Sequence, residues 1–106
     1  MNHIYDQIAL ERKRQDEKWG EQNFKMFSIL YDKDKVKDVL MRQLAAFREN
    51  NEREKQICWY TILEEEICEA FLEPDLVKAR AEMIQVCAVG VQIIEALDRQ
   101  IDGGKV

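Results

Sequence analysis

Residues that break helices are scarce in this sequence. Its 106 residues include one proline and four glycines, and two of the glycines are adjacent near the end, at Gly103 and Gly104. Long stretches therefore lack a helix breaker, which is typical of a helical protein. With 46% apolar residues, the chain is long enough to bury one core and too short for two. We expect one all-α domain over residues 1–106.

Cysteine is also sparse, and its spacing argues against two kinds of site. The three cysteines, Cys58, Cys68 and Cys87, are an odd number, and no two of them form a C-x-x-C pair. Disulfide frameworks and zinc sites usually need paired cysteines. We therefore expect neither, and we interpret all three as small apolar residues of the core.

The sequence lacks an excess of positive charge and has no long apolar run. It has 16 Lys and Arg against 21 Asp and Glu, which gives a formal net charge of -5. Because nucleic-acid polymers and membrane surfaces attract a basic face, neither is an expected partner. No run approaches the roughly 18 apolar residues that span a membrane, and residues 1–6 lack the features of a signal peptide. We expect a cytoplasmic protein, in which an anionic substrate needs local cations or a bridging metal.

Apolar residues recur at helical spacing in four segments of the chain. The predicted helices cover residues 3–18, 34–50, 53–72 and 74–101. Asp34 is the expected N-cap of the second helix, and Pro74 is expected at the first position of the fourth. Residues 52–56 fit either a turn or the first turn of the third helix. Because only the connection from Leu72 to Asp75 joins the last two helices, they must pack antiparallel. These features predict an antiparallel, four-helix bundle-like fold.

The first predicted helix has a mixed inward face. At about 100° per residue, one side begins with apolar residues and continues with polar ones: Ile4, Ile8, Glu11, Arg12, Gln15 and Trp19. Such a face either pairs buried charges or lines a site. The sequence leaves both interpretations open.

Apolar side chains cover nearly the whole circumference of the last predicted helix. One face carries Val86, Val89, Ile93 and Ala96, and other faces carry Met83, Cys87, Gly90, Val91, Ile94 and Leu97. Because a surface helix of a small monomer exposes a polar face, this pattern predicts burial between subunits. We expect a homodimer or homotetramer assembled through helix packing.

Acidic residues gather on the third predicted helix and meet a further pair on the fourth. Glu66 and Glu69 are three residues apart, as are Glu82 and Gln85, so each pair projects from one side of its helix. At about 1.5 Å of rise per residue, Glu66 lies roughly 10 Å before the turn and Glu82 roughly 12 Å after it. We therefore expect the two pairs at the same height in one seam.

Carboxylates that converge in a seam repel each other unless a hard divalent cation neutralises them. Oxygen ligands suit Mg²⁺ or Mn²⁺, and such an ion could bridge the phosphates of a nucleotide and activate water. The alternative is that residues 64–66 and Glu69 form an ordinary solvated helix face. Because Glu82 leads directly into an apolar stripe, burying it without a partner would be costly. The pattern therefore favours a metal site.

The acidic motif resembles that of the MazG-like all-α nucleoside triphosphate pyrophosphohydrolases, which occur in bacteria and phages. The family pattern is E-E-x-x-E on one helix and E-x-x-D on the next. The first part is matched by Glu65, Glu66 and Glu69. Glu82 matches the second part, in which Gln85 replaces the aspartate. Residues 1–23 and 57–101 carry the likeness, whereas about 24–56 do not match.

The resemblance implies a helical oligomer that requires Mg²⁺ and cleaves a nucleoside triphosphate to the monophosphate and pyrophosphate. It implies metal binding by Glu66, Glu69, Glu82 and Gln85, and catalytic roles for Glu65 and Glu66. Glu65 would either bind a second metal or orient water. Replacing the aspartate by Gln85 removes a negative charge and a group that could act as a base. The alternative is therefore a weakened or inactive member that binds metal or nucleotide or serves as a helical interaction module.

Four further residues are candidates for binding the substrate. Lys18 and Trp19 end the first predicted helix, where an ammonium could meet a phosphate and an indole could stack on a base. Arg12 and Arg80 are further candidates for phosphate contacts. The structural alternatives are a core tryptophan beside a solvated lysine, and arginines that pair with neighbouring glutamates. The sequence alone does not decide between them.

Overall fold

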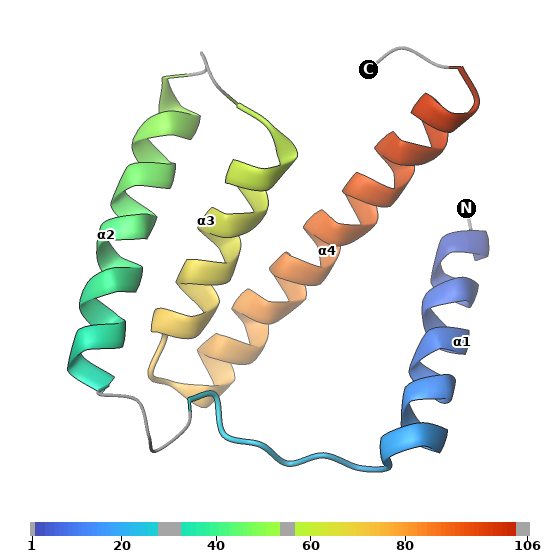
Figure 1. The fold of residues 1–106 in the computed structure, drawn as a ribbon, viewed down its shortest axis with the longest axis horizontal. Helices are drawn as coiled ribbons and strands as arrows, with labels where there is room; N and C mark the ends of the chain where they lie inside the picture. Colours follow the sequence, from blue (N-terminus) through green and yellow to red (C-terminus); the bar gives the residue numbers. More distant parts are fainter. Residues whose placement is uncertain (1, 28–32, 54–56, 104–106) are drawn as a thin grey trace.

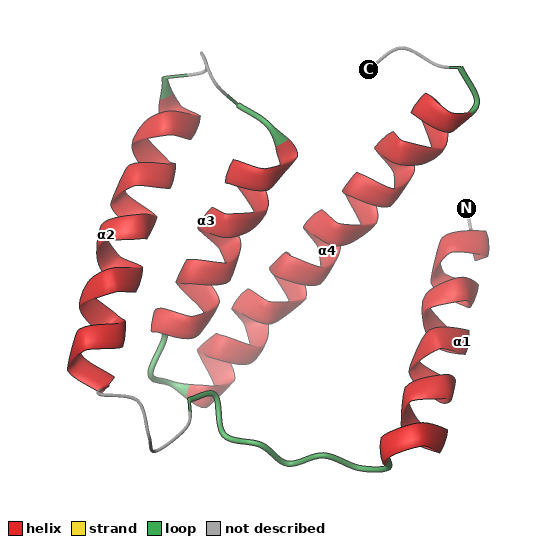
Figure 2. Ribbon diagram, in the orientation of Figure 1, coloured by secondary structure: helices red, strands yellow, loops and turns green. Residues whose placement is uncertain are grey.

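The computed structural model describes residues 2–27, 33–53 and 57–103, and these residues form helices without any strand (Figure 2). The helices are α1 (Asn2–Trp19), α2 (Lys33–Glu52), α3 (Trp59–Leu72) and α4 (Leu76–Ile101). The all-helical prediction is confirmed. None of these helices is both long and apolar enough to cross a membrane.

Three of the helices form a layer, and the fourth lies beside it. Helix α2 packs against α3, and α3 packs against α4, with successive helices running in opposite directions (Figure 1). Helix α1 lies to the side of this layer, and the segment 20–27 leads from it back toward α2 (Figure 1). The molecule measures 45 × 43 × 22 Å. The expected four-helix bundle is therefore not closed within one chain.

The starts of α3 and α4 differ from the prediction because local hydrogen bonds set them. Helix α4 begins after Pro74, since the Asp75 side chain accepts a hydrogen bond of 3.0 Å from the Val77 backbone and acts as the N-cap. Cys58 is extended, and its backbone donates to the Thr61 hydroxyl at 3.3 Å. This cap places Cys58 before α3, whereas residues 54–56 of the predicted helix lie outside the described residues.

Helix α2 carries an apolar stripe at helical spacing, formed by Val36, Leu40, Leu44 and Phe47. It begins one residue before Asp34, the expected cap, and continues to Glu52, just beyond the expected end. Leu44 is buried, and the Phe47 ring lies edge-on to Tyr60 of α3, with centroids 6.1 Å apart. The stripe therefore faces α3, and its aromatic end fixes the two helices against each other.

Few large side chains are fully buried in the described residues. The buried apolar side chains are Ile4, Leu44, Cys68, Ala70, Ala79, Val89 and Ala96. Cys68 is 1% exposed, as expected of a core cysteine, whereas Cys58 and Cys87 are exposed, so the prediction that all three are buried was wrong for these two. Cys58 is exposed because it caps a helix, and Cys87 because it lies on a face of α4 that the chain leaves uncovered.

The mixed face of α1 does not point into a core. Ile4 is buried and Gln15 is half-buried, whereas the remaining residues of that face are exposed. Arg12 instead pairs with Asp16 at 2.7 Å, four residues further along the same helix. Because such pairs form within one helix, they need no neighbour to satisfy them. The polar half of the face is therefore solvated.

Candidate functional site

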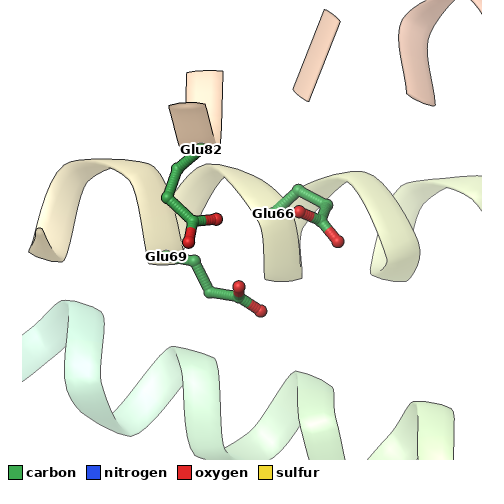
Figure 3. A group of neighbouring side chains, drawn as sticks. All are labelled: Glu66, Glu69 and Glu82. Atoms are coloured by element: carbon green, nitrogen blue, oxygen red, sulfur yellow. The ribbon is translucent and has the colours of Figure 1, made fainter. Parts of the chain in front are cut away.

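Three glutamates from two helices converge in the seam between α3 and α4. Glu66 and Glu69 project from neighbouring turns of α3, and Glu82 reaches toward them from α4 (Figure 3). One carboxylate oxygen from each of the three residues lies within 4.8 Å of the other two. We call these residues the glutamate triad.

The short connection between the helices sets this convergence. Glu73, Pro74 and Asp75 join α3 to α4, and the Asp75 cap starts α4 at Leu76. The chain therefore turns back at once, and Glu82 returns to the height of α3 that carries the other two glutamates (Figure 3). The expected common height of Glu66 and Glu82 is what the structure shows.

The seam is electrostatically unfavourable for carboxylates without a cation. Burial raises the pKa of Glu66, and the nearby charges of Glu65 and Glu82 raise it further. Burial also raises the pKa of Glu69, as does the charge of Glu66, while Arg48 lowers it. One oxygen each of Glu66 and Glu82 is buried and receives no hydrogen bond within the described residues. Such oxygens are costly to bury unless a proton or a cation contacts them.

The donor set of the triad fits a hard divalent cation. All three ligand atoms are carboxylate oxygens, which Mg²⁺ and Mn²⁺ prefer. Mg²⁺ binds oxygen at about 2.0–2.1 Å, so oxygens on opposite sides of the ion are about 4.2 Å apart. The three oxygens lie within 4.8 Å of one another, which is close to this largest spacing around one ion. The triad is also half-buried, unlike the solvated helix face that was the alternative.

Helix α2 contributes two residues that sequence reasoning missed. Arg48 lies 3.6 Å from Glu69, and the Asn51 side chain donates a hydrogen bond of 2.8 Å to Glu65. A signal for both was present, because they lie four residues after Leu44 and Phe47 and so continue the inward stripe of α2. Polar residues on an otherwise apolar stripe indicate a polar partner on the facing helix.

Two of the predicted site residues lie outside the triad. Glu65 turns toward α2, where its carboxylate accepts the hydrogen bond from Asn51. Gln85 is exposed on α4, although it lies only three residues after Glu82. Among the His, Cys, Asp and Glu side chains of the described residues, Glu66, Glu69 and Glu82 are grouped closely enough to hold an ion together. The metal-binding role of Gln85 stays a prediction.

The predicted substrate-binding residues are not brought to the triad. Lys18 and Trp19 end α1, beside the layer, and the Lys18 ammonium lies 5.0 Å from the centre of the Trp19 ring. Arg12 also lies on α1, where it donates to Gln15 and Asp16 in an open hollow. Arg80 is exposed on α4. The cation that the described structure does bring to the triad is Arg48.

The raised pKa values predict how the stability of the metal-free protein depends on pH. In the unfolded chain the carboxyls of Glu66 and Glu69 return to an ordinary pKa of 4.5. The folded protein therefore binds protons more tightly, and this stabilisation is complete below the ordinary pKa and lost as the pH rises through the raised values.

Urea unfolding in EDTA from pH 5 to pH 8 measures this effect. We expect the wild type to lose more stability over this range than Glu66→Gln, in which the titrating group is absent. Glu64→Gln, a change on the same helix outside the triad, is expected to follow the wild type. Parallel curves for the wild type and Glu66→Gln would contradict the electrostatic description of the seam.

Comparison with known proteins adds no family assignment to this geometry. No protein-family model, no curated protein and no solved structure matches the chain. The MazG-like resemblance stays a prediction that rests on the sequence of residues 1–23 and 57–101, with the acidic motif at its centre.

Proposed function

We propose that this protein is a metal-dependent nucleotide pyrophosphohydrolase that converts a nucleoside triphosphate to the monophosphate and pyrophosphate. The observation that carries this proposal is the convergence of Glu66, Glu69 and Glu82 from two antiparallel helices, with buried oxygens on Glu66 and Glu82 that lack a hydrogen-bond donor. A triad of this kind, in a protein with net negative charge, needs a cation before it can accept a polyanion.

Each residue of the site has a part in the proposed reaction. The triad holds the cation, Mg²⁺ or Mn²⁺, which when bound neutralises phosphate charge and lowers the pKa of water. Glu65 would orient the attacking water, and Arg48, which lies 3.6 Å from Glu69, would contact a phosphate. Water adds across the bond between the α- and β-phosphates, so one product is the monophosphate and the other is pyrophosphate.

Pyrophosphate release tests this proposal directly. The wild-type protein is incubated with Mg²⁺ or Mn²⁺ and a panel of standard and modified nucleoside triphosphates, and its helical fold is checked by circular dichroism under the same conditions. We expect metal-dependent release of pyrophosphate from at least one of them. A folded protein that turns over none of the panel would contradict the enzyme.

A substitution at Gln85 tests whether the protein is an enzyme or, alternatively, an inactive metal- or nucleotide-binding module. Because this side chain is exposed and lies outside the triad, we expect Gln85→Asp to change Mn²⁺ affinity and turnover by less than about threefold. Calorimetry with Mn²⁺ and a pyrophosphate assay measure the two quantities. A large gain of activity from an inactive wild type would favour the alternative.

We also propose that the active form is a dimer or a higher oligomer of this chain. A compact monomer of this mass exposes about 6,200 Å², whereas a single copy exposes 8853 Å². Large apolar side chains are exposed on α4, among them Leu76, Val77 and Ile84, and on α1, among them Tyr5 and Leu10. A second copy that covers these surfaces accounts for the apolar circumference of α4 and for the position of α1 beside the layer.

A further inference from the structure

The side-chain amide of Asn51 makes three hydrogen bonds to α3. Its nitrogen donates to Glu65 Oε1 at 2.8 Å and to the backbone oxygen of Thr61 at 3.2 Å. Its oxygen accepts from the Thr61 hydroxyl at 2.8 Å and, more weakly, from the Asn50 amide at 3.4 Å. Both hydrogens and the oxygen are therefore engaged, and the last turn of α2 is joined to the first two turns of α3.

The orientation of this amide follows from its partners. A backbone carbonyl and a carboxylate can only accept hydrogen bonds, so the group that faces Thr61 O and Glu65 must be the NH₂ of Asn51. The oxygen is then left to face the Thr61 hydroxyl. The Asn51 amide therefore has one orientation, in which an N–H group points at the Glu65 carboxylate.

The Glu65 carboxylate, which accepts this hydrogen bond, interacts electrostatically with the glutamate triad. Glu65 is adjacent in sequence to Glu66, and its charge raises the pKa of both Glu66 and Glu69, so it lies within electrostatic reach of the triad. Like charges so close repel, and a free side chain would turn into solvent. A neutral amide donor stabilises the Glu65 carboxylate in place and leaves its negative charge, whereas a lysine or arginine would neutralise that charge.

We infer that Asn51 is a positioning residue that holds the charged Glu65 carboxylate beside the metal triad for its part in hydrolysis. This inference rests on the proposed function, in which Glu65 orients water. It assigns a role to α2, the helix that the acidic motif does not include. Thr61 supports the same arrangement, because its hydroxyl fixes the oxygen end of the amide.

A double-mutant cycle between Asn51 and Glu65 tests the inference. The four proteins are the wild type, Asn51→Ala, Glu65→Ala and the double variant, and the values measured are kcat and KM for pyrophosphate release. We expect Asn51→Ala to lower kcat by about 10- to 100-fold, the factor typical of a hydrogen bond to a charged group, with KM little changed. In the Glu65→Ala background the same change is expected to alter kcat by less than about twofold.

Two measurements separate positioning from a general structural role. Calorimetry with Mn²⁺ alone is expected to give nearly the wild-type affinity for Asn51→Ala, since the triad is untouched. The side-chain amide NMR signals of Asn51 are expected to shift on Glu65→Ala in the metal-free protein, because one hydrogen bond is lost. Gln43→Ala, an exposed amide on α2, is the control and is expected to change none of these values.

Thr61→Val keeps the inference testable if Asn51→Ala does not fold. It leaves Asn51 in place but removes the hydroxyl, which also accepts the capping hydrogen bond from the Cys58 backbone. A smaller loss of kcat is expected, and the part of it that acts through Asn51 is expected to disappear in the Glu65→Ala background. Equal losses in both backgrounds, for either variant, would overturn the inference while leaving the proposed function intact. A wild type without turnover would instead overturn the proposed function, and the inference with it.

Discussion

Glu82→Gln is expected to lower both Mn²⁺ affinity and pyrophosphate release by about 10²- to 10³-fold, the range seen when one electrostatic contact to reacting groups is removed. Glu82 is the one member of the triad that comes from α4, and one of its oxygens is buried without a hydrogen-bond donor. Glutamine keeps the shape of the side chain but lacks the charge that a hard cation requires. Calorimetry and initial rates measure the two losses.

We expect Glu82→Gln to fold, so that its loss of metal binding can be assigned to the missing ligand and not to unfolding. Removing one of three converging charges relieves repulsion, so the unfolding midpoint in EDTA at pH 7 is expected to equal or exceed that of the wild type. Glu95→Gln, which removes a carboxylate elsewhere on α4, is the matched control and should keep metal affinity and turnover. Wild-type metal binding by folded Glu82→Gln would contradict the assignment of the triad.

Ile84→Asp is expected to weaken the proposed association of subunits by about 100-fold, comparable to the loss of a central interface residue. Ile84 is 54% exposed in the single chain and lies on the same side of α4 as Val77, seven residues earlier. A charge at this position would have to be desolvated when a second copy covers the helix. Sedimentation at micromolar concentration measures the shift from oligomer to monomer.

The matched control for this variant is Gln100→Asp, which adds the same charge to an exposed position on another side of α4. It is expected to sediment as the wild type does. A wild-type protein that sediments as a strict monomer would contradict the oligomer. An oligomer that Ile84→Asp leaves intact would show that another surface forms the contact.

The convergence of the triad could be predicted because it depends on local rules alone. Helical spacing places Glu66 and Glu69 on one side of α3, and a connection too short to cross elsewhere forces α4 to return beside it. Only the register of Glu82 then remains, and counting residues from the turn gives it. The first residues of α3 and α4 could not be predicted as well, because the caps at Cys58 and Asp75 depend on single hydrogen bonds.

The contributions of α2 and α1 could not be predicted in the same way. The stripe of α2 places Arg48 and Asn51 on its inward side, but the connection from α2 to α3 does not fix which residues meet. Their contacts with Glu69 and Glu65 therefore come from the structure. Helix α1 was expected to turn a mixed face inward, yet its polar residues pair along the helix itself. Helical periodicity identifies a face and does not identify the neighbour that covers it.

A crystal structure of the wild-type protein soaked with Mn²⁺, with anomalous diffraction to locate the ion, tests directly whether the glutamate triad binds metal. We expect an anomalous peak between α3 and α4, about 2.1 Å from one carboxylate oxygen each of Glu66, Glu69 and Glu82. A map with all three side chains in clear density and no peak among them, at millimolar Mn²⁺ and neutral pH, would contradict it.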